Sequence, residues 1–274
     1  MQLQVRLIRV TYLSFHFIFT LPLLGALLWA ARGVFSDSRR KALLGAWLFL
    51  SCIAFVYTTP WDVHLVSLGV WGYPEESVLA TVRGVPVEEY AFFLLQTAIT
   101  SCWFLICLRR TNQSLLPAAT TRSHRRAFWV VPCLAYLCLL GLYALQFEQG
   151  TYFGLIIVWA TPIMILHWLV GGFWLAGRLR FLARVVLPPT LYFWCTDWIA
   201  LQAGTWHINP QLSLGPSLFG LPLEEALFFL VTNVMVAQGL YLYVAVVENW
   251  SRLRANALSY LRALLNPTGK VRDV

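Results

Sequence analysis

Two pairs of adjacent glutamates are the side chains with the clearest capacity for chemistry. Glu88 and Glu89 lie in the sequence VPVEEYAFFL at residues 85–94, and Glu224 and Glu225 lie in LPLEEALFFL at residues 221–230. Each pair follows a proline that suits the first turn of a helix, and acids at that end complement the helix dipole. Each pair also enters a long apolar segment, where ionisable groups are costly and usually functional. Because the whole pattern recurs, it indicates a functional site.

The chemistry that these acids could perform is general acid catalysis. Burial and a second nearby carboxylate both favour the protonated form of a carboxyl group, whereas a helix N-terminus favours the charged form. Where burial prevails, the site holds a proton at neutral pH and can protonate an apolar substrate. Consecutive helical residues point about 100° apart. One glutamate of each pair can therefore face the bundle interior while the other faces a loop or the partner repeat.

Aromatic residues and two aspartates accompany the glutamates in the sequence. An aromatic face can stabilise a carbocation, and this attraction grows when water is absent; the alternatives are an interfacial aromatic belt or plain helix packing. Asp62 and Asp197 could orient a glutamate or act as a base, or they could be ordinary acids at the edges of loops. The aromatic candidates are Trp61, Trp71, Phe92, Phe93, Trp198, Trp206, Phe228 and Phe229.

The elements that must position these residues are expected to be membrane helices. The 274 residues are 59% hydrophobic and only 12% charged, with a mean hydropathy of +0.68, whereas soluble domains carry about 25% charged residues. A span needs roughly 20 apolar residues. The apolar runs predict an all-α membrane protein with seven transmembrane helices and two irregular loops, 58–86 and 204–222. The predicted spans are residues 10–31, 42–57, 87–108, 127–147, 152–177, 185–203 and 223–247.

The basic residues agree with seven spans in the cell membrane. Short cytoplasmic loops collect Lys and Arg, and seven spans place seventeen of the twenty basic residues on the side of the C-terminus. The other side keeps Arg6, Arg9 and Arg83. We therefore expect a cytoplasmic C-terminus, and the net charge of +8 records membrane orientation rather than nucleic-acid binding.

An internal repeat joins the two glutamate pairs. The motif recurs after 136 residues, Asp62 and Trp71 match Asp197 and Trp206 after 135, and Tyr12 and Pro22 match Tyr152 and Pro162 after 140. The offset covers four spans, so both copies have the same orientation, related by an axis along the membrane normal. This predicts a 3+1+3 arrangement with both motifs on one membrane face. The predicted divisions are a first repeat at 1–110, a connector helix at 111–150, a second repeat at 151–248 and a basic cytoplasmic tail at 249–274.

These residues resemble a known family. The two Pro-x-Glu-Glu-x-x-Phe-Phe segments, with TPWD at residues 59–62 and GVW at residues 69–71 before the first, are similar to the integral-membrane lycopene cyclases of the heterodimeric or fused type. Here both halves lie in one chain, and the resemblance covers residues 10–247. The second copy reads CTDW at residues 195–198, which leaves open whether the two halves form equivalent sites.

The resemblance implies an isomerase of carotenoid biosynthesis. It implies that the acyclic ψ end groups of lycopene close to β-ionone rings, giving β-carotene or γ-carotene, and that Glu88, Glu89, Glu224 and Glu225 are catalytic. A protonated glutamate would protonate the terminal alkene, the next double bond would close the ring, and a carboxylate would remove a proton. We expect no cofactor, because no Gly-x-Gly-x-x-Gly motif occurs, and no metal, because the histidines are scattered. The expected partners are the lipophilic carotenoid and membrane lipid; homo-oligomerisation and association with other carotenoid enzymes stay open.

Other classes of membrane protein share parts of this pattern. A parallel 3+1+3 repeat is also the plan of small sugar porters of the SWEET type, so a small-molecule transporter is the alternative function. A retinal protein would need a lysine inside a span, but Lys41 and Lys270 both lie in polar segments. Membrane di-iron hydroxylases need clustered histidines, and prenyl transferases need aspartate-rich metal motifs; the sequence has neither.

Overall fold

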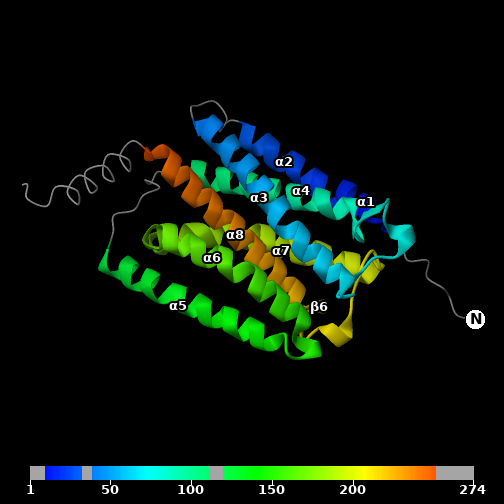
Figure 1. Ribbon diagram of the computed structural model, residues 1–274. Helices are drawn as coiled ribbons and strands as arrows, with labels where there is room; N and C mark the ends of the chain where they lie inside the picture. The colour runs from blue at the N-terminus through cyan, green and yellow to red at the C-terminus, as the bar shows by residue number, and fades with distance from the viewer. Residues whose placement is uncertain (1–9, 33–38, 112–119, 251–274) are drawn as a thin grey trace, which may run out of the picture.

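The computed structural model describes residues 10–32, 39–111 and 120–250, and long helices make up most of this part of the chain (Figure 1). The helices are α1 (Tyr12–Phe15), the π-helical turn η1 (His16–Thr20), α2 (Leu21–Ala31), α3 (Arg39–Ser67), α4 (Val87–Arg109), α5 (Thr121–Ala144), α6 (Thr151–Gly177), α7 (Leu179–Ala203) and α8 (Leu223–Glu248). The 3-10 turns are η3 (Glu75–Ser77), η4 (Glu148–Gly150) and η5 (Pro210–Leu212). The strands are β1 (Trp71–Gly72), β2 (Thr81–Val82), β3 (Val85–Pro86), β4 (His207–Ile208), β5 (Ser217–Leu218) and β6 (Leu221–Pro222).

Six helical stretches within the described residues are long and apolar enough to cross a membrane. They are Tyr12–Ala31, Leu44–Ser67, Val87–Arg109, Ser123–Ala144, Glu148–Gly177 and Leu223–Val247. The seventh long helix, α7, has 25 residues and is not among these six. It packs against α8 and α4. The predicted all-α membrane class is therefore confirmed in its coarse form, whereas the tail beyond Trp250 lies outside the described residues.

Three helices begin or end elsewhere than the apolar runs predicted. The expectation of an irregular segment from residue 58 was wrong, because α3 continues through Pro60 to Ser67. A membrane helix can contain a proline when neighbouring helices provide hydrogen-bond partners for the polar groups that the proline leaves free. At this level Trp61 Nε1 donates to the carbonyl oxygen of Leu155 over 3.0 Å, which ties α3 to α6. The helices α5 and α7 begin six residues earlier than predicted, because basic residues in their first turns interrupt the apolar pattern without interrupting the helix.

Two small hairpins lead into the helices that carry the glutamates. Strands β2 and β3 pair before α4, and β5 and β6 pair before α8. The turn residues Arg83 and Gly84 have φ of 55° and 83°, and Phe219 and Gly220 have φ of 52° and 88°. Two successive positive φ values are typical of the type I′ turn that suits a two-residue hairpin. The same local structure thus precedes both glutamate pairs, at the 136-residue offset of the sequence motif.

The two irregular segments meet each other over one end of the bundle. Strands β1 and β4 pair antiparallel, with Trp71 opposite Ile208 and Gly72 opposite His207. A Cβ atom on Gly72 would collide with the His207 ring, so this close approach requires glycine. The pairing fixes the segment before α4 against the segment before α8, near the first turns of both helices (Figure 1).

Candidate active site

A small chamber lies between the first turns of α4 and α8. It has a volume of about 30 Å³, about the share of one molecule in liquid water. Three acids face it, Glu89, Asp197 and Glu225, together with aromatic side chains from α1, β1, α4, α8 and the segments that follow β1 and α7. The aromatic lining consists of Tyr12, Phe15, Trp71, Tyr73, Phe92, Trp206, Phe228 and Phe229. The chamber thus brings together one glutamate from each sequence motif.

Glu225 is buried, and two donors hold the same oxygen of its carboxyl group. The hydroxyl of Tyr152 donates to Oε1 over 2.6 Å, and the indole Nε1 of Trp71 donates to Oε1 over 3.1 Å. Tyr152 lies in the first turn of α6, whereas Trp71 comes from β1. Trp71, which belongs to the segment before α4, therefore supports the acid at the start of α8.

Glu89 is buried in a corresponding way. The hydroxyl of Tyr12 donates to Oε2 over 2.5 Å, and the hydroxyl of Tyr73 donates to the same oxygen over 3.3 Å. A protonated carboxyl group has one acceptor oxygen and one O–H donor. Since the tyrosine and tryptophan donors occupy one oxygen of each glutamate, the geometry leaves the other oxygen to carry and deliver a proton.

Tyr73 lies between α3 and α4, outside the spanning helices, and it acts as a donor at neutral pH. Burial raises the pKa of the Tyr73 hydroxyl well above its ordinary value, and the negative charge of Glu89 raises this pKa further. The hydroxyl therefore keeps its proton and can stabilise charge on Glu89. The position 135 residues later is Ile208, so this donor has no counterpart beside Glu225.

The other two glutamates hold the hairpin segments. Glu88 Oε1 accepts from the backbone N–H of Leu79 over 2.8 Å, and Glu224 Oε1 accepts from the backbone N–H of Leu214 over 2.6 Å. Neither side chain lines the chamber. In each motif the first glutamate thus fixes the preceding loop, and the second one faces the chamber.

His16 also binds the first turn of α4. Its Nε2 lies 2.9 Å from the carbonyl oxygen of Glu88, and its Nδ1 lies 3.0 Å from Thr20 Oγ1. Because a carbonyl oxygen can only accept, Nε2 carries the hydrogen of the neutral ring. His16 opens the π-helical turn η1, a feature that often occurs at functional sites.

The two aspartates are helical and buried, which argues against the alternative that they are ordinary acids at the edges of loops. Asp62 lies in α3 with 0% exposure and Asp197 lies in α7 with 2%. Asp197 faces the chamber, and its Oδ1 accepts from Trp206 Nε1 over 3.0 Å. The Trp206 ring in turn contacts the Tyr12 ring at 4.9 Å. Within the described residues, neither oxygen of Asp62 has a hydrogen-bond partner.

The predicted aromatic residues divide into three groups. Trp71, Trp206, Phe92, Phe228 and Phe229 line the chamber. Trp61 stacks on Trp159 at 4.5 Å and on Phe228 at 5.7 Å, so it stands behind the chamber wall. Phe93 lines a separate cavity beside α8, and Trp198 is 42% exposed and does not line the chamber.

The tyrosines and the histidine of the site were not predicted from the sequence. Tyr12 and Tyr152 carried a signal, because they match across the repeat, and each donates to a chamber glutamate. Tyr73 and His16 match no residue in the other half that could have drawn attention to them.

The comparisons with known proteins identify a family. A model of the family described as lycopene cyclase matches residues 9–108 and 149–244. A lycopene beta-cyclase of Halobacterium salinarum is 36% identical over 242 residues, which cover 88% of this chain and 98% of the relative. Bifunctional lycopene cyclase/phytoene synthases of Sporisorium reilianum and Colletotrichum graminicola are 37% and 38% identical; the matches cover 85% and 81% of this chain but 35% and 41% of those proteins. No solved structure matches the chain.

Proposed function

The chain belongs to the lycopene cyclase family and is an enzyme of carotenoid biosynthesis, and we propose that its chamber closes the ψ end groups of lycopene to β-ionone rings. The observation that carries this proposal is the pairing of Glu89 and Glu225 in one chamber, each with one oxygen fixed by two donors. The products would be γ-carotene after one closure and β-carotene after two. The alternative of a sugar-porter-like transporter finds no support in these relatives.

The reaction requires only a proton that is added and a proton that is removed. The free O–H of one chamber glutamate adds its proton to the terminal C=C bond, which leaves a tertiary carbocation and a carboxylate. The π electrons of the next C=C bond form the new C–C bond and close the six-membered ring. The other chamber glutamate, as carboxylate, takes a proton from the carbon beside the new cation, and a C=C bond forms in the ring. Nothing is oxidised or reduced.

The donors to the glutamates would contribute in the transition state. As a glutamate gives up its proton, negative charge develops on the carboxyl group, and hydrogen bonds to that charge become stronger. Tyr152 and Trp71 would serve Glu225 in this way when Glu225 is the acid, and Tyr12 and Tyr73 would serve Glu89 when Glu89 is the acid. Phe92, Phe228 and Phe229 line the space where the carbocation would form, and aromatic faces attract cations.

The remaining acids would position these groups. Glu88 and Glu224 would hold the hairpins against the first turns of α4 and α8 through their bonds to Leu79 and Leu214. Asp197 would orient Trp206 against Tyr12, and Tyr12 orients Glu89. Asp62 interacts electrostatically with Glu89.

We further propose that the chain spans the membrane seven times as a parallel 3+1+3 repeat with its C-terminus in the cytoplasm. The paired hairpins, the paired tyrosine-to-glutamate bonds and the two blocks of the family match support the repeat. The asymmetric distribution of basic residues supports the orientation. The fungal relatives join a cyclase and a phytoene synthase in one chain, which supports a place for this chain beside other carotenoid enzymes.

The proposal is tested by changing each motif glutamate to glutamine in a host that accumulates lycopene. Glutamine keeps the size and an acceptor oxygen but cannot donate an acidic proton. We expect Glu89→Gln and Glu225→Gln to abolish cyclic pigment, and Glu88→Gln and Glu224→Gln to retain most of it, because an amide oxygen can still accept from Leu79 or Leu214. Chromatography of the pigments gives the readout. Full activity of both chamber variants would sink the assignment of the acids.

A further inference from the structure

A larger cavity runs along α8 beyond the chamber. It has a volume of about 460 Å³, within the range of about 300–1,000 Å³ that small-molecule sites occupy. Residues from α3, α6 and α8 contribute most of its mainly apolar lining. On α8 the lining follows one face of the helix through Phe228, Thr232, Met235, Gly239, Leu242 and Val246. We call this cavity the α8 trough.

The α8 trough is long enough for an extended hydrocarbon chain. Phe228 and Val246 are 18 residues apart, and at about 1.5 Å per helical residue the lined face extends about 27 Å. This length approaches the hydrocarbon thickness of a bilayer, about 30 Å. A compact ligand would use only part of such a site, whereas a linear polyene can contact the whole of it.

The trough and the chamber meet at Phe228. This ring lines both spaces, and it lies three residues after Glu225, on the next turn of α8. The chamber of about 30 Å³ is too small for the end group of the substrate. The Phe228 side chain must therefore move before the end group can enter the chamber. An end group that arrives through the trough would therefore reach Glu225 as Phe228 is displaced.

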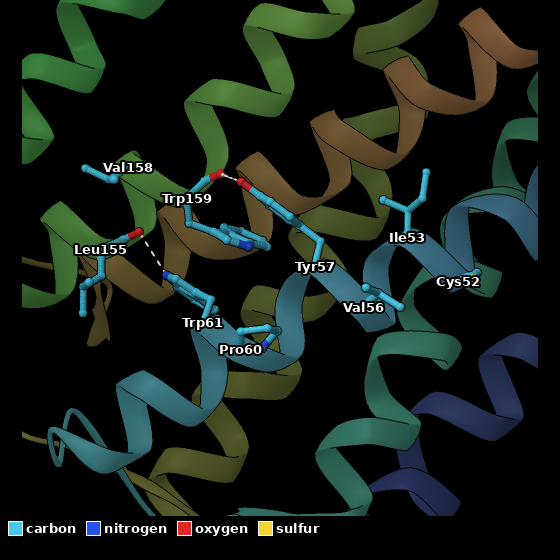
Figure 2. Close-up of a pocket in the computed structure, with 9 residues that line it drawn as sticks. All are labelled: Cys52, Ile53, Val56, Tyr57, Pro60, Trp61, Leu155, Val158 and Trp159. Carbon is cyan, nitrogen blue, oxygen red and sulfur yellow. Dashed lines mark hydrogen bonds between the residues drawn. The ribbon is translucent and has the colours of Figure 1, made fainter.

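A lateral opening between α3 and α6 joins the trough from the side (Figure 2). It has a volume of about 590 Å³ and shares Ile53, Tyr57 and Trp159 with the trough. Val56 at its edge is 65% exposed. Tyr57 donates to the carbonyl oxygen of Trp159 over 2.8 Å, which bridges the two helices where the opening and the trough meet. An apolar substrate dissolved in lipid could enter here.

Gly239 lies where α3 and α6 come close to α8. A Cβ atom built there would lie 2.9 Å from Leu50 Cδ2 and 3.6 Å from His167 Nε2, so α3 and α6 both approach the glycine. Gly239 is 11 residues beyond Phe228, or about 16 Å along the helix axis. A larger side chain would divide the trough into a part near the chamber and a distal part.

We infer that the α8 trough binds the polyene chain of the carotenoid while the terminal end group occupies the chamber, and that the opening between α3 and α6 admits the substrate from lipid. This inference rests on the proposed function and assigns the substrate-binding residues that the chamber alone does not supply. The distal part of the trough would then determine how turnover depends on the length of the substrate, whereas the glutamates determine the chemistry.

The test compares lycopene with a shortened acyclic apocarotenoid that carries the same ψ end group but ends before Gly239. In proteoliposomes, Gly239→Leu should lower kcat/KM for lycopene by at least about tenfold and leave the short substrate within about twofold of the unchanged chain. Ala54→Phe, which narrows the trough from α3, is a second blocking variant and should lower lycopene turnover. Ala26→Phe, on the exposed face of α2, is the matched control and should leave kcat/KM for both substrates unchanged.

The outcomes separate the trough from the proposed function. The short substrate reports folding, because a misfolded variant loses both substrates. If Gly239→Leu affects both substrates equally, or neither, the trough assignment is wrong, and it is also wrong if Ala54→Phe leaves lycopene turnover unchanged. If the unchanged chain closes neither substrate, the proposed function fails, and lycopene binding followed by tryptophan quenching then decides the trough. Weaker binding in Gly239→Leu than in Ala26→Phe supports the trough, and equal binding overturns it.

Discussion

Changing Tyr152 to phenylalanine removes the hydroxyl that lies 2.6 Å from Glu225 Oε1 and leaves the ring in place. The ring stays packed edge-to-face against Trp71, with centroids 5.8 Å apart, and the Trp71 bond to Glu225 remains. A hydrogen bond to a charged group contributes about 1.5–3 kcal/mol, and about 1.4 kcal/mol corresponds to a tenfold change in rate. Because this bond strengthens as Glu225 becomes a carboxylate, we expect kcat to fall about 10- to 150-fold.

The assay uses purified protein in proteoliposomes at saturating lycopene, with the initial rate of cyclic pigment measured by chromatography. Saturation separates kcat from KM, so a change in substrate binding is not mistaken for a change in chemistry. Tyr192→Phe is the matched control, because the Tyr192 hydroxyl donates over 2.9 Å to the backbone carbonyl of Phe19, away from the chamber. That variant loses a neutral hydrogen bond, worth about 0.5–1.5 kcal/mol of stability, and should keep its kcat.

A Tyr152→Phe enzyme with a kcat within about twofold of the unchanged chain would refute the reasoning, since it would mean that the bond contributes nothing as charge develops. A loss of equal size in Tyr192→Phe would also refute it, because the effect would then come from general packing. Thermal unfolding of both variants in the same lipid accompanies the rates.

Three further changes probe the same site. Tyr12→Phe removes the hydroxyl that lies 2.5 Å from Glu89 Oε2 and should lower kcat by a similar factor for the closure in which Glu89 is the acid; an unchanged kcat would mean that Glu89 does not act as the acid. Trp71→Phe removes a longer bond of 3.1 Å and should lower kcat by at most about tenfold. A larger fall in kcat than in Tyr152→Phe would contradict the expectation that the shorter bond contributes more. Gly72→Ala should lower the free energy of unfolding by about 1–3 kcal/mol through overpacking against His207, measured by thermal denaturation. Gly25→Ala, with open space at its Cβ position, is its control and should not destabilise.

The sequence predicted the parts of the site that depend on helix ends and on the repeat. A helix N-terminus after a proline places two acids at the edge of an apolar span, and the repeated motif indicates that both pairs serve one purpose. The sequence also predicted that adjacent glutamates point in different directions. It could not say which member faces the interior, because that depends on the segments just before the hairpins, whose backbone N–H groups at Leu79 and Leu214 bind Glu88 and Glu224.

The parts that sequence reasoning missed depend on contacts between distant segments. Trp71 supports Glu225, 154 residues away, because β1 and β4 pair across the bundle. Asp62 is buried because α3 continues through Pro60, and the rule that proline ends a helix does not hold where α6 supplies partners for the neighbouring side chains. The α8 trough arises from gaps between three helices, which no single periodic pattern records.

The most direct test of the account is cyclisation of lycopene by the purified protein in D₂O, followed by mass spectrometry of the rings. Acids that exchange with solvent would carry deuterium, so proton-initiated closure predicts one deuterium atom for each ring formed, in the unchanged chain and in Glu88→Gln. Glu89→Gln and Glu225→Gln should form no ring. Rings without deuterium, or labelled rings formed by both chamber variants, would contradict the claim that these two glutamates exchange protons with the substrate.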